Sequence, residues 1–321
     1  MIYGAAKVTW NTNGIFYTRD PIEVSIDPQV FDISTDAHGV IDHRVSNHQV
    51  VVRCTPEGRI TAGLFGTGAG TLWPYGNYAI GSSIFGITEN HATDATLVID
   101  SKDLKLHTLH NAAVTSMPTI TLSTTKTVIG PVEFTGIRTN SGTWAADDTL
   151  YSVDEVGSAF VDSGFAVTDI KTQVYTGVWT AITGFTSIST YDGWTIEFSV
   201  DTVDVEVDDT GLIDRRISNV SAMARCIPVG STPTVTQIAG QQKLQATAGY
   251  ARGMTMGTNA ADLVITGADA TTVVTLKNAS LKSAGYRFGS TTLRVGEIGF
   301  VTTRKLTAGA ATDPIWTITP A

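Results

Sequence analysis

The chain has 321 residues, of which 42% are hydrophobic and only 16% are charged, and its net charge is −9 at pH 7. This apolar content excludes a disordered chain, and the acidic balance argues against a protein that grips nucleic-acid phosphates. No apolar run approaches the roughly 20 residues of a membrane-spanning helix, the N-terminus shows no secretory signal pattern, and two cysteines cannot form a disulfide-dense scaffold.

Much of the chain predicts β-strands, because apolar and polar residues alternate with a period of two. Such strands are predicted, in chain order, over residues 22–27, 119–123, 128–137 and 203–208. In the last of these the polar face is entirely acidic. Gly39 and Gly211 stand at the turns of two predicted hairpins. One short helix per half of the chain is predicted near residues 101–109 or 241–251.

The sequence contains an internal duplication. Six segments of the first half return in the second half in the same order, with an offset that falls from about 174 to about 166 residues. The pairs are residues 22–27 and 196–201, 41–47 and 213–219, 53–56 and 225–228, 97–99 and 263–265, 108–112 and 275–279, and 130–134 and 296–300. Solenoid units repeat every 20 to 50 residues or so, so this longer period indicates a tandem repeat of a whole domain.

We therefore predict two tandem, homologous domains. The first repeat covers residues 1–151, an acidic linker rich in small residues covers 152–165, and the second repeat covers 166–321. The predicted fold class is all-β with minor α, and each repeat is expected to form a β-sandwich or barrel-like domain.

Residues 64–86 differ from the strands around them, because they combine glycines with Trp73, Tyr75, Tyr78 and Phe85. The second repeat has a Gln- and Met-rich sequence at the corresponding place. A long Gly-rich segment inside a compact domain is usually functional or ordered by a partner. Two interpretations stay open: a loop that packs on its own sandwich, and a loop that a partner orders.

Motifs of common enzymes are missing from the sequence. Residues 66–71 are rich in glycine but lack the Gly-Lys-Ser/Thr ending of a phosphate loop, and no Gly-x-Ser-x-Gly motif is present. Cys54 and Cys226 occupy the same position of the two repeats, which indicates one buried core position seen twice. No pair of carboxylates stands out as a glycosidase pair would. We expect neither enzymatic activity nor a cofactor.

Two groups of residues bear on metal binding. His38, His43 and His48 could gather on neighbouring strands as zinc ligands, although solvated strand residues are the simpler interpretation. The acidic clusters at residues 27–36 and 201–209 lack the glutamate that closes a calcium loop. We predict no metal site.

The duplication singles out the pattern Ile-Asp-x-Arg-Val/Ile-Ser-Asn. Asp42 and Arg44, like their counterparts Asp214 and Arg216, lie two residues apart and so share one side of a strand. Such a pair can bind across a subunit boundary, where the planar guanidinium is favoured. It can also be a local surface ion pair worth at most about 1 kcal/mol. The sequence does not separate these interpretations.

The order of motifs in each repeat resembles that of the tail tube (major tail) proteins of tailed bacteriophages. The motifs that carry the resemblance are residues 108–113 (TLHNAA), the Ser-Thr-Thr of residues 123–125, and residues 130–136 (GPVEFTG). The resemblance covers both repeats in outline. It implies β-sandwich domains with an extended loop or arm, which stack as six-fold rings into a tube that conducts DNA during ejection. A duplicated chain would build such a ring from three chains.

The resemblance also implies a location and partners. The chain would be a structural virion protein of the phage tail, made in the host cytoplasm. Its partners would be copies of itself in homotrimeric rings, other tail proteins, and genomic DNA that passes without specific binding, with no membrane contact. Candidates for subunit contacts are Asp42, Arg44, Asp214 and Arg216. Candidates for an acidic lumen, which repels phosphates, are Asp32, Asp36, Asp204, Glu206 and Asp208. Candidates for contacts between rings are Trp73, Tyr75, Tyr78 and Phe85.

Two alternatives remain. A distal tail, hub or baseplate ring protein would share the fold and the rings without polymerising lengthwise. A tandem-sandwich adhesin or carbohydrate-binding module would expose Trp73, Tyr75 and Tyr78 as stacking platforms for sugar rings.

Overall fold

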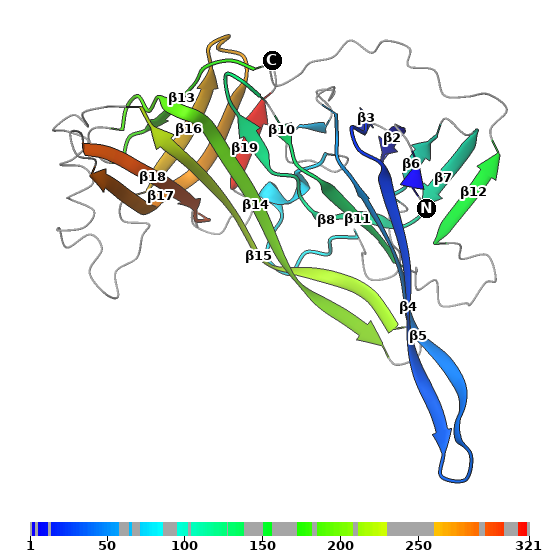
Figure 1. The fold of residues 1–321 in the computed structure, drawn as a ribbon. Coiled ribbons are helices and arrows are strands. Elements are labelled where there is room, and N and C mark those ends of the chain that lie inside the picture. Colours follow the sequence, from blue (N-terminus) through cyan, green and yellow to red (C-terminus); the bar gives the residue numbers. More distant parts are fainter. Residues whose placement is uncertain are drawn as a thin grey trace.

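The computed structural model describes most of the chain. The residues described are 2–3, 6–11, 14–57, 64–65, 71–85, 95–101, 104–126, 128–137, 150–155, 172–181, 185–207, 211–229, 260–288, 293–304 and 314–319. Strands dominate these residues, which confirms the all-β fold class. Figure 1 shows two β-rich halves side by side, with two long hairpins extending from the body.

The first repeat forms two five-stranded sheets. One sheet contains, in spatial order, β1 (Ile2–Tyr3), β4 (Ile22–Thr35), β5 (Gly39–Cys54), β11 (Val132–Ile137) and β8 (Ala112–Ser116). The other contains β12 (Tyr151–Glu155), β7 (Lys105–Leu109), β6 (Leu97–Asp100), β2 (Lys7–Trp10) and β3 (Gly14–Tyr17). Phe134 of the first sheet packs on Trp10 of the second with ring centroids 5.0 Å apart. The two sheets therefore share one core as a β-sandwich.

The second repeat is built on one nine-stranded sheet. Its spatial order is β10 (Val128–Ile129), β9 (Ile120–Leu122), β14 (Thr190–Val207), β15 (Gly211–Pro228), β18 (Leu293–Thr302), β17 (Val273–Phe288), β16 (Ala261–Gly267) and β13 (Tyr175–Trp179), and β19 (Trp316–Thr319) pairs with β17. The long strand β17 belongs to both layers, because its first part pairs with β16 and β19 and its last part with β18. Across these layers Trp179 packs on Phe300, with ring centroids 5.1 Å apart.

The strand pairings confirm the duplication residue by residue. Cys54 lies opposite Val132 as Cys226 lies opposite Ile298. The β-bulges also recur: β4 has them at Gln29/Val30 and Ile33/Ser34, and β14 has them at Asp201/Thr202 and Val205/Glu206. A β-bulge is a specific structural feature of a strand and not a random defect. The recurrence of both bulges at equivalent positions therefore shows that the two hairpins have the same structure.

A left-handed asparagine marks the same point of both repeats. Asn111, between β7 and β8, has φ 44°, and Asn278, inside β17, has φ 46°. Asparagine tolerates this backbone conformation better than most residues. The chain passes here from one layer of the sandwich to the other, so the conserved sequence Thr-Leu-x-Asn-Ala of the two repeats encodes this bend.

Three sequence-based expectations need correction. The hairpins correspond with a constant offset of 172 residues, so Ile22 matches Trp194 and not Ile196. The helix predicted near residues 101–109 is instead strand β7, whereas residues 241–251 lie outside the described part of the chain. Residues 152–155, predicted as linker, belong to strand β12, which pairs with β7.

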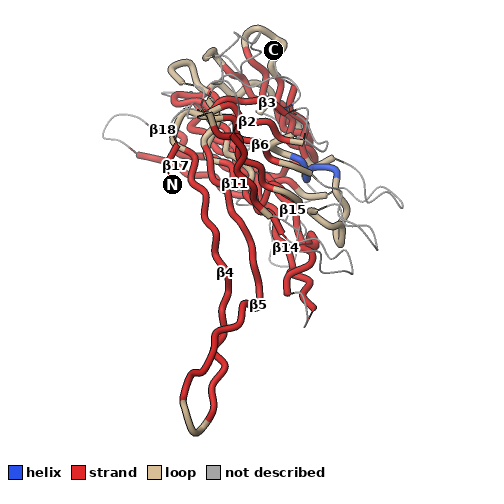
Figure 2. Tube along the Cα trace, turned by 90° about the vertical axis from the view of Figure 1, so that its right-hand side faces the viewer, coloured by secondary structure: helices blue, strands red, loops and turns tan. Residues whose placement is uncertain are grey.

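The two hairpins extend well beyond the sandwiches, as Figure 2 shows for β4 and β5. We call residues 26–48 of β4–β5 the first arm, and the corresponding residues 198–207 of β14 with residues 211–220 of β15 the second arm. The alternation of residues 203–208 predicted one buried face, but Val203 is 59% exposed. Val203 thus meets solvent, whereas Leu212, Asp214 and Ile217 on the partner strand of the same hairpin are buried.

Candidate assembly interface

The two repeats are joined by a strand that crosses from one to the other. β9 belongs to the first repeat, yet it pairs antiparallel with the edge of β14, with Thr121 opposite Thr195. The neighbouring pairs, Leu122–Trp194 and Ile120–Ile196, are fully buried apolar side chains. The second repeat therefore completes its sheet with a hairpin from the first repeat.

A second contact covers the other edge of the second arm. Residues 81–85 run along β15 and make backbone hydrogen bonds with it. Gly81 N donates to Ile217 O (2.8 Å), Ile217 N donates to Ser82 O (2.9 Å), and Ile84 N donates to Arg215 O (2.9 Å). This segment of the first repeat thus adds an edge to the sheet of the second, which buries Ile217 and Phe85.

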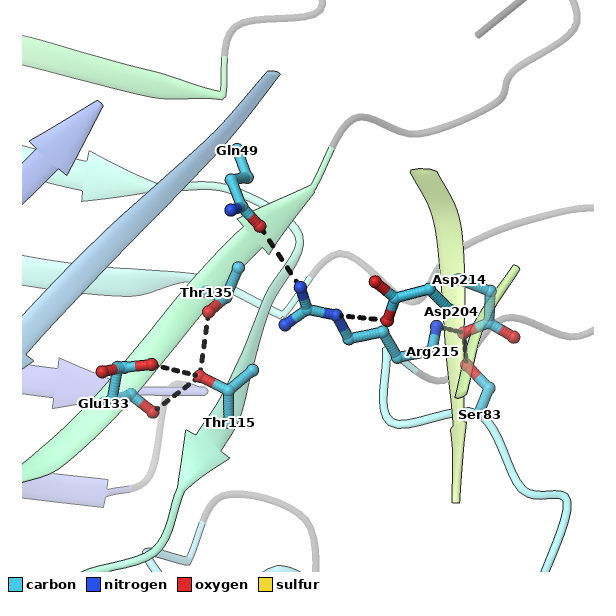
Figure 3. Close-up of polar contacts among 8 residues, drawn as sticks. All are labelled: Gln49, Ser83, Thr115, Glu133, Thr135, Asp204, Asp214 and Arg215. Atoms are coloured by element: carbon cyan, nitrogen blue, oxygen red, sulfur yellow. Dashed lines mark hydrogen bonds and ion pairs between the residues drawn. The ribbon is translucent and has the colours of Figure 1, made fainter. Parts of the chain in front are cut away.

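Asp214 lies at the centre of this contact (Figure 3). It is only 2% exposed. Its carboxylate accepts hydrogen bonds from Ser83 Oγ (2.5 Å) and from Arg215 N (2.7 Å), and its Oδ2 lies 3.2 Å from Arg216 Nε. The Asp214–Arg216 pair therefore lies on one side of the strand, as its spacing predicted, and it joins the two repeats within one chain.

Arg215 links the second arm to the base of the first arm. Its Nε donates to Asp204 Oδ1 (2.9 Å), and its Nη2 donates to Gln49 Oε1 (3.3 Å), as Figure 3 shows. The sequence analysis did not select Arg215 or Gln49. One difference between the repeats could have pointed to this contact: the position of His43 in the first repeat is occupied by Arg215 in the second. The longer arginine side chain reaches a neighbour that histidine would not.

The aromatic segment lies inside the chain. Trp73, Tyr75 and Phe85 are buried, and Tyr78 is half-buried. Trp73 stacks on Phe65 with ring centroids 5.1 Å apart and lies 6.2 Å from Phe198 of the second repeat. The burial of Trp73, Tyr75 and Phe85 leaves these three side chains unavailable for contacts between stacked assemblies or for stacking on sugars. Instead they hold the two repeats together.

Hydrogen bonds reinforce this aromatic junction. Trp316 Nε1 donates to Trp73 O (3.3 Å), Ile315 N donates to Gly76 O (2.9 Å), and Arg304 Nη2 donates to Tyr78 O (2.5 Å). Gly76 lies in the single 3-10 turn η2 (Pro74–Asn77). Of the two interpretations of residues 64–86, the described part fits a segment that packs within its own chain, on the neighbouring repeat.

The first arm carries the matching residues in an exposed setting. Asp42 and Arg44 are exposed, whereas their counterpart Asp214 is buried. His43 Nδ1 lies 2.7 Å from Asp32 Oδ1, which repeats the Arg215–Asp204 pair of the second arm. The two arms thus share this contact and differ in whether another part of the chain covers them.

The acidic candidates within the described residues lie on the arms. Asp32, Asp36, Asp204 and Glu206 are exposed, and Asp208 lies outside the described residues. Asp32 and Asp204 occupy equivalent positions, and both have a basic side chain beside them. Arg215 therefore offsets the charge of Asp204, whereas His43 can offset that of Asp32 only when it is protonated.

A run of exposed apolar side chains on the first arm was not predicted. Its members are Ile26, Val30, Phe31, Val40 and Ile41, of which Phe31 is 46% and Ile41 56% exposed. A concentration of large exposed apolar side chains on one hairpin makes it a candidate site of interaction. Sequence alternation could not reveal it, because the pattern gives the two faces of a strand and not which of them meets solvent.

The residues considered for chemistry have structural settings. Cys54 and Cys226 are buried and form no disulfide, and burial raises the pKa of both thiols, which keeps them protonated. Within the described ranges no group of three or more His, Cys, Asp or Glu side chains is arranged to hold a metal ion. Among the same residues, no helix has the length and apolar character needed to cross a membrane.

The different settings of the two matching aspartates give a prediction. Asp214→Ala should lower the free energy of unfolding by about 2–4 kcal/mol, because it strips a buried site of a charged acceptor and leaves Arg216 and Ser83 without it. Asp42→Ala, the matched control, should change it by less than about 0.5 kcal/mol in the isolated subunit. Urea unfolding of both variants measures the difference. Equal effects would contradict the assigned role of Asp214.

Comparisons with known proteins do not identify a family. No family model and no curated protein matches the chain. Among solved structures, the chain is similar to the binding domain of botulinum neurotoxin serotype D/C VPI 5993, with 9% identity over 98% of each chain and a TM-score of 0.12. It is likewise similar to the botulinum neurotoxin serotype C1 binding domain, with 10% identity over 98% of this chain and 99% of that one and a TM-score of 0.12. Likenesses this weak carry no argument.

Proposed function

We propose that this chain is a structural virion protein whose rings stack into the tail tube through which phage DNA is ejected. The observation that carries the proposal is the pair of equivalent arms. The second arm is covered by residues 81–85 of the first repeat, whereas the first arm exposes five large apolar side chains. An arm that is covered where a neighbouring repeat is available, and exposed where none is, fits a subunit made to join others.

The duplication supports a closed ring. Each chain contributes two units of the same topology, so three chains supply six units. Contacts that run from the first repeat to the second are heterologous, and heterologous contacts close into rings when the rotation allows. These two features support a trimer with pseudo-six-fold symmetry, which agrees with the resemblance of the sequence to tail tube proteins.

The acidic arms fit a conduit for DNA. We assign Asp32, Asp36, Asp204, Glu206 and Asp208 to the lumen, where negative charge repels phosphates and lets the duplex slide. The subunit would work in the virion tail with other tail proteins as neighbours and would act by assembly without catalysing a reaction. A hub or baseplate ring remains the second candidate, since it uses the same rings without stacking them.

Electron microscopy of the purified protein across a concentration series, with sedimentation velocity, tests this function. Hollow tubes or stacked rings with three chains per ring are the expected result. If the protein forms closed rings that never stack, the hub or baseplate function would be favoured over the tail tube. A monomer at every concentration would overturn both.

A further inference from the structure

The second repeat contains a hairpin that corresponds to the crossing hairpin β9–β10. In β9–β10, Thr121 lies opposite Val128 and Ile120 opposite Ile129. At the far ends of β17 and β18, Arg287 lies opposite Arg294 and Tyr286 opposite Val295, so the register is the same with an offset of 166 residues. We call residues 286–288 of β17, together with residues 293–295 of β18, the tip hairpin.

The edge that receives the crossing hairpin also has a counterpart. β9 pairs with Trp194, Thr195 and Ile196 of β14, and the offset of 172 residues places Ile22, Glu23 and Val24 of β4 at the same positions. Each chain thus has two hairpins and two receiving edges. One hairpin and one edge meet within the chain, which leaves the tip hairpin and the β4 edge as a matching pair.

From this match we propose that the tip hairpin of one chain pairs with the β4 edge of a second chain, antiparallel, with Tyr286–Phe288 opposite Ile22–Val24. The proposal rests on the proposed function in one respect, the assembly of several chains, and names the residues that join them. Figure 1 shows the ends of β17 and β18 on the opposite side of the molecule from β4. One chain cannot make this contact with itself, so the contact would join chains head to tail and close into a ring where the rotation between them allows.

The sequence at the proposed register is complementary. In the intrachain contact, Val128, Thr121 and Thr195 lie in one row across three strands. The corresponding row between chains reads Arg294, Arg287 and Glu23. Two arginines directly opposite each other repel, and opposite charges on neighbouring strands attract. At the proposed register, Glu23 of the second chain, which lies opposite Arg53 of its own chain, would bring a negative charge next to the row of Arg287 and Arg294.

The rows on either side are apolar in both cases. Within the chain, Ile120–Ile196 and Leu122–Trp194 are buried pairs. Between chains these rows become Tyr286–Val24 and Phe288–Ile22. The alternation of apolar, polar and apolar rows is that of a sheet with one buried face, so the proposed register would place the apolar side on the core.

Strand β1 occupies the β4 edge in the isolated subunit. Ile2 lies opposite Glu23 and Tyr3 opposite Ile22, which are the positions that the tip hairpin would take. An uncovered edge strand is a site of uncontrolled association. A two-residue strand shields the edge with few hydrogen bonds, and a longer hairpin can displace it during assembly.

Engineered disulfides test the register directly. The double variant Glu23→Cys/Arg287→Cys should form chains linked covalently to one another under mild oxidation, up to a closed trimer on a non-reducing gel. The pair Ser25→Cys/Arg287→Cys, shifted by two residues, should give much less. The pair Thr121→Cys/Thr195→Cys occupies the equivalent intrachain position and should close without an increase in mass. Cys54 and Cys226 are buried and should not interfere.

Charge reversal tests the same contact without cysteines. Glu23→Arg or Arg287→Glu should raise the concentration needed for assembly about tenfold or more, because an attractive pair becomes repulsive. The combined variant Glu23→Arg/Arg287→Glu should restore much of the loss. Lys277→Glu reverses a charge on the same strand β17 away from the tip, and should assemble like the parent.

The outcomes of these experiments distinguish a failure of the proposed contact between chains from a failure of the proposed tail tube function. Tubes that form equally in the charge-reversal variants, with no interchain disulfide while the Thr121/Thr195 pair closes, would overturn the contact and leave the proposed function standing. Rings that depend on Glu23 and Arg287 but never stack would support the contact and overturn the tube. A parent protein that is monomeric at every concentration would overturn both.

Discussion

Gly193→Ala should lower the free energy of unfolding by about 3 kcal/mol or more. Gly193 has φ +88°, a backbone conformation that costs other residues about 1–2 kcal/mol. A Cβ at this position would lie 2.0 Å from Leu122 O and 2.8 Å from Ser123 Cβ. Leu122 belongs to β9, which is held against β14 at this point, so relief of the clash requires the junction between the repeats to open. Overpacking of this kind adds about 1–3 kcal/mol.

A matched control separates the two costs. Gly39 also has a positive φ, +68°, but a Cβ there would meet nothing within 4 Å. Gly39→Ala should therefore show the backbone cost alone, about 1–2 kcal/mol. Urea unfolding curves of both variants and the parent measure the difference. If Gly193→Ala were no more destabilising than Gly39→Ala, the close packing of β9 on β14 at this residue would be wrong.

The strands and the duplication could be predicted because both are written into local sequence. Alternation with a period of two identified β4 and β14, and repeated motifs identified the two halves. The alignment of residues 22–27 with 196–201 was nevertheless wrong by two residues. A shift of two residues leaves every side chain on the same face of a strand. An alternating pattern therefore cannot distinguish Ile196 from Trp194 as the residue of the second repeat that is equivalent to Ile22. The positions of the β-bulges settle the alignment of the two repeats, and the bulges can be seen in the strand pairing of the structure but not in the sequence.

The predicted helix near residues 101–109 failed for a related reason. Five residues, Lys105–Leu109, form β7, and a run this short carries too little periodicity to separate a helix from a strand. The pairing of β7 with β6 and β12 on its two sides decides the conformation. The strand β12 was likewise hidden in a stretch whose acidic and small residues resemble a linker, because its outer positions are exposed.

The contact between the repeats could not be predicted from either repeat alone. Asp42 and Asp214 have almost the same neighbours in sequence, yet one is exposed and the other is buried. Their difference comes from Ser83, more than 100 residues away from Asp214. The aromatic residues of the segment 64–86 were correctly identified as unusual, but their partners Phe198 and Trp316 belong to the second repeat, and composition does not reveal such pairings.

Trp73→Ala should be among the most destabilising single substitutions in the chain, with a loss of about 3–5 kcal/mol in the free energy of unfolding. The side chain is fully buried, its Nε1 donates to Pro118 O (2.8 Å), and its ring packs between Phe65 and Phe198. Removal of the ring leaves a cavity between the repeats. Trp73→Phe, which keeps an aromatic ring and loses the hydrogen bond, should cost much less. Denaturant unfolding measures both.

A double-mutant cycle shows whether this loss comes from the junction between the repeats. Trp73 and Phe198 belong to different repeats and lie 6.2 Å apart, so Trp73→Ala and Phe198→Ala should be non-additive by about 0.5–1.5 kcal/mol. Trp10 packs on Phe134 within the first repeat, and Trp10→Ala combined with Phe198→Ala should be additive. Additivity in both cycles would mean that the aromatic segment stabilises its own repeat only. Coupling confined to Trp73 and Phe198 would show that these two side chains hold the repeats together.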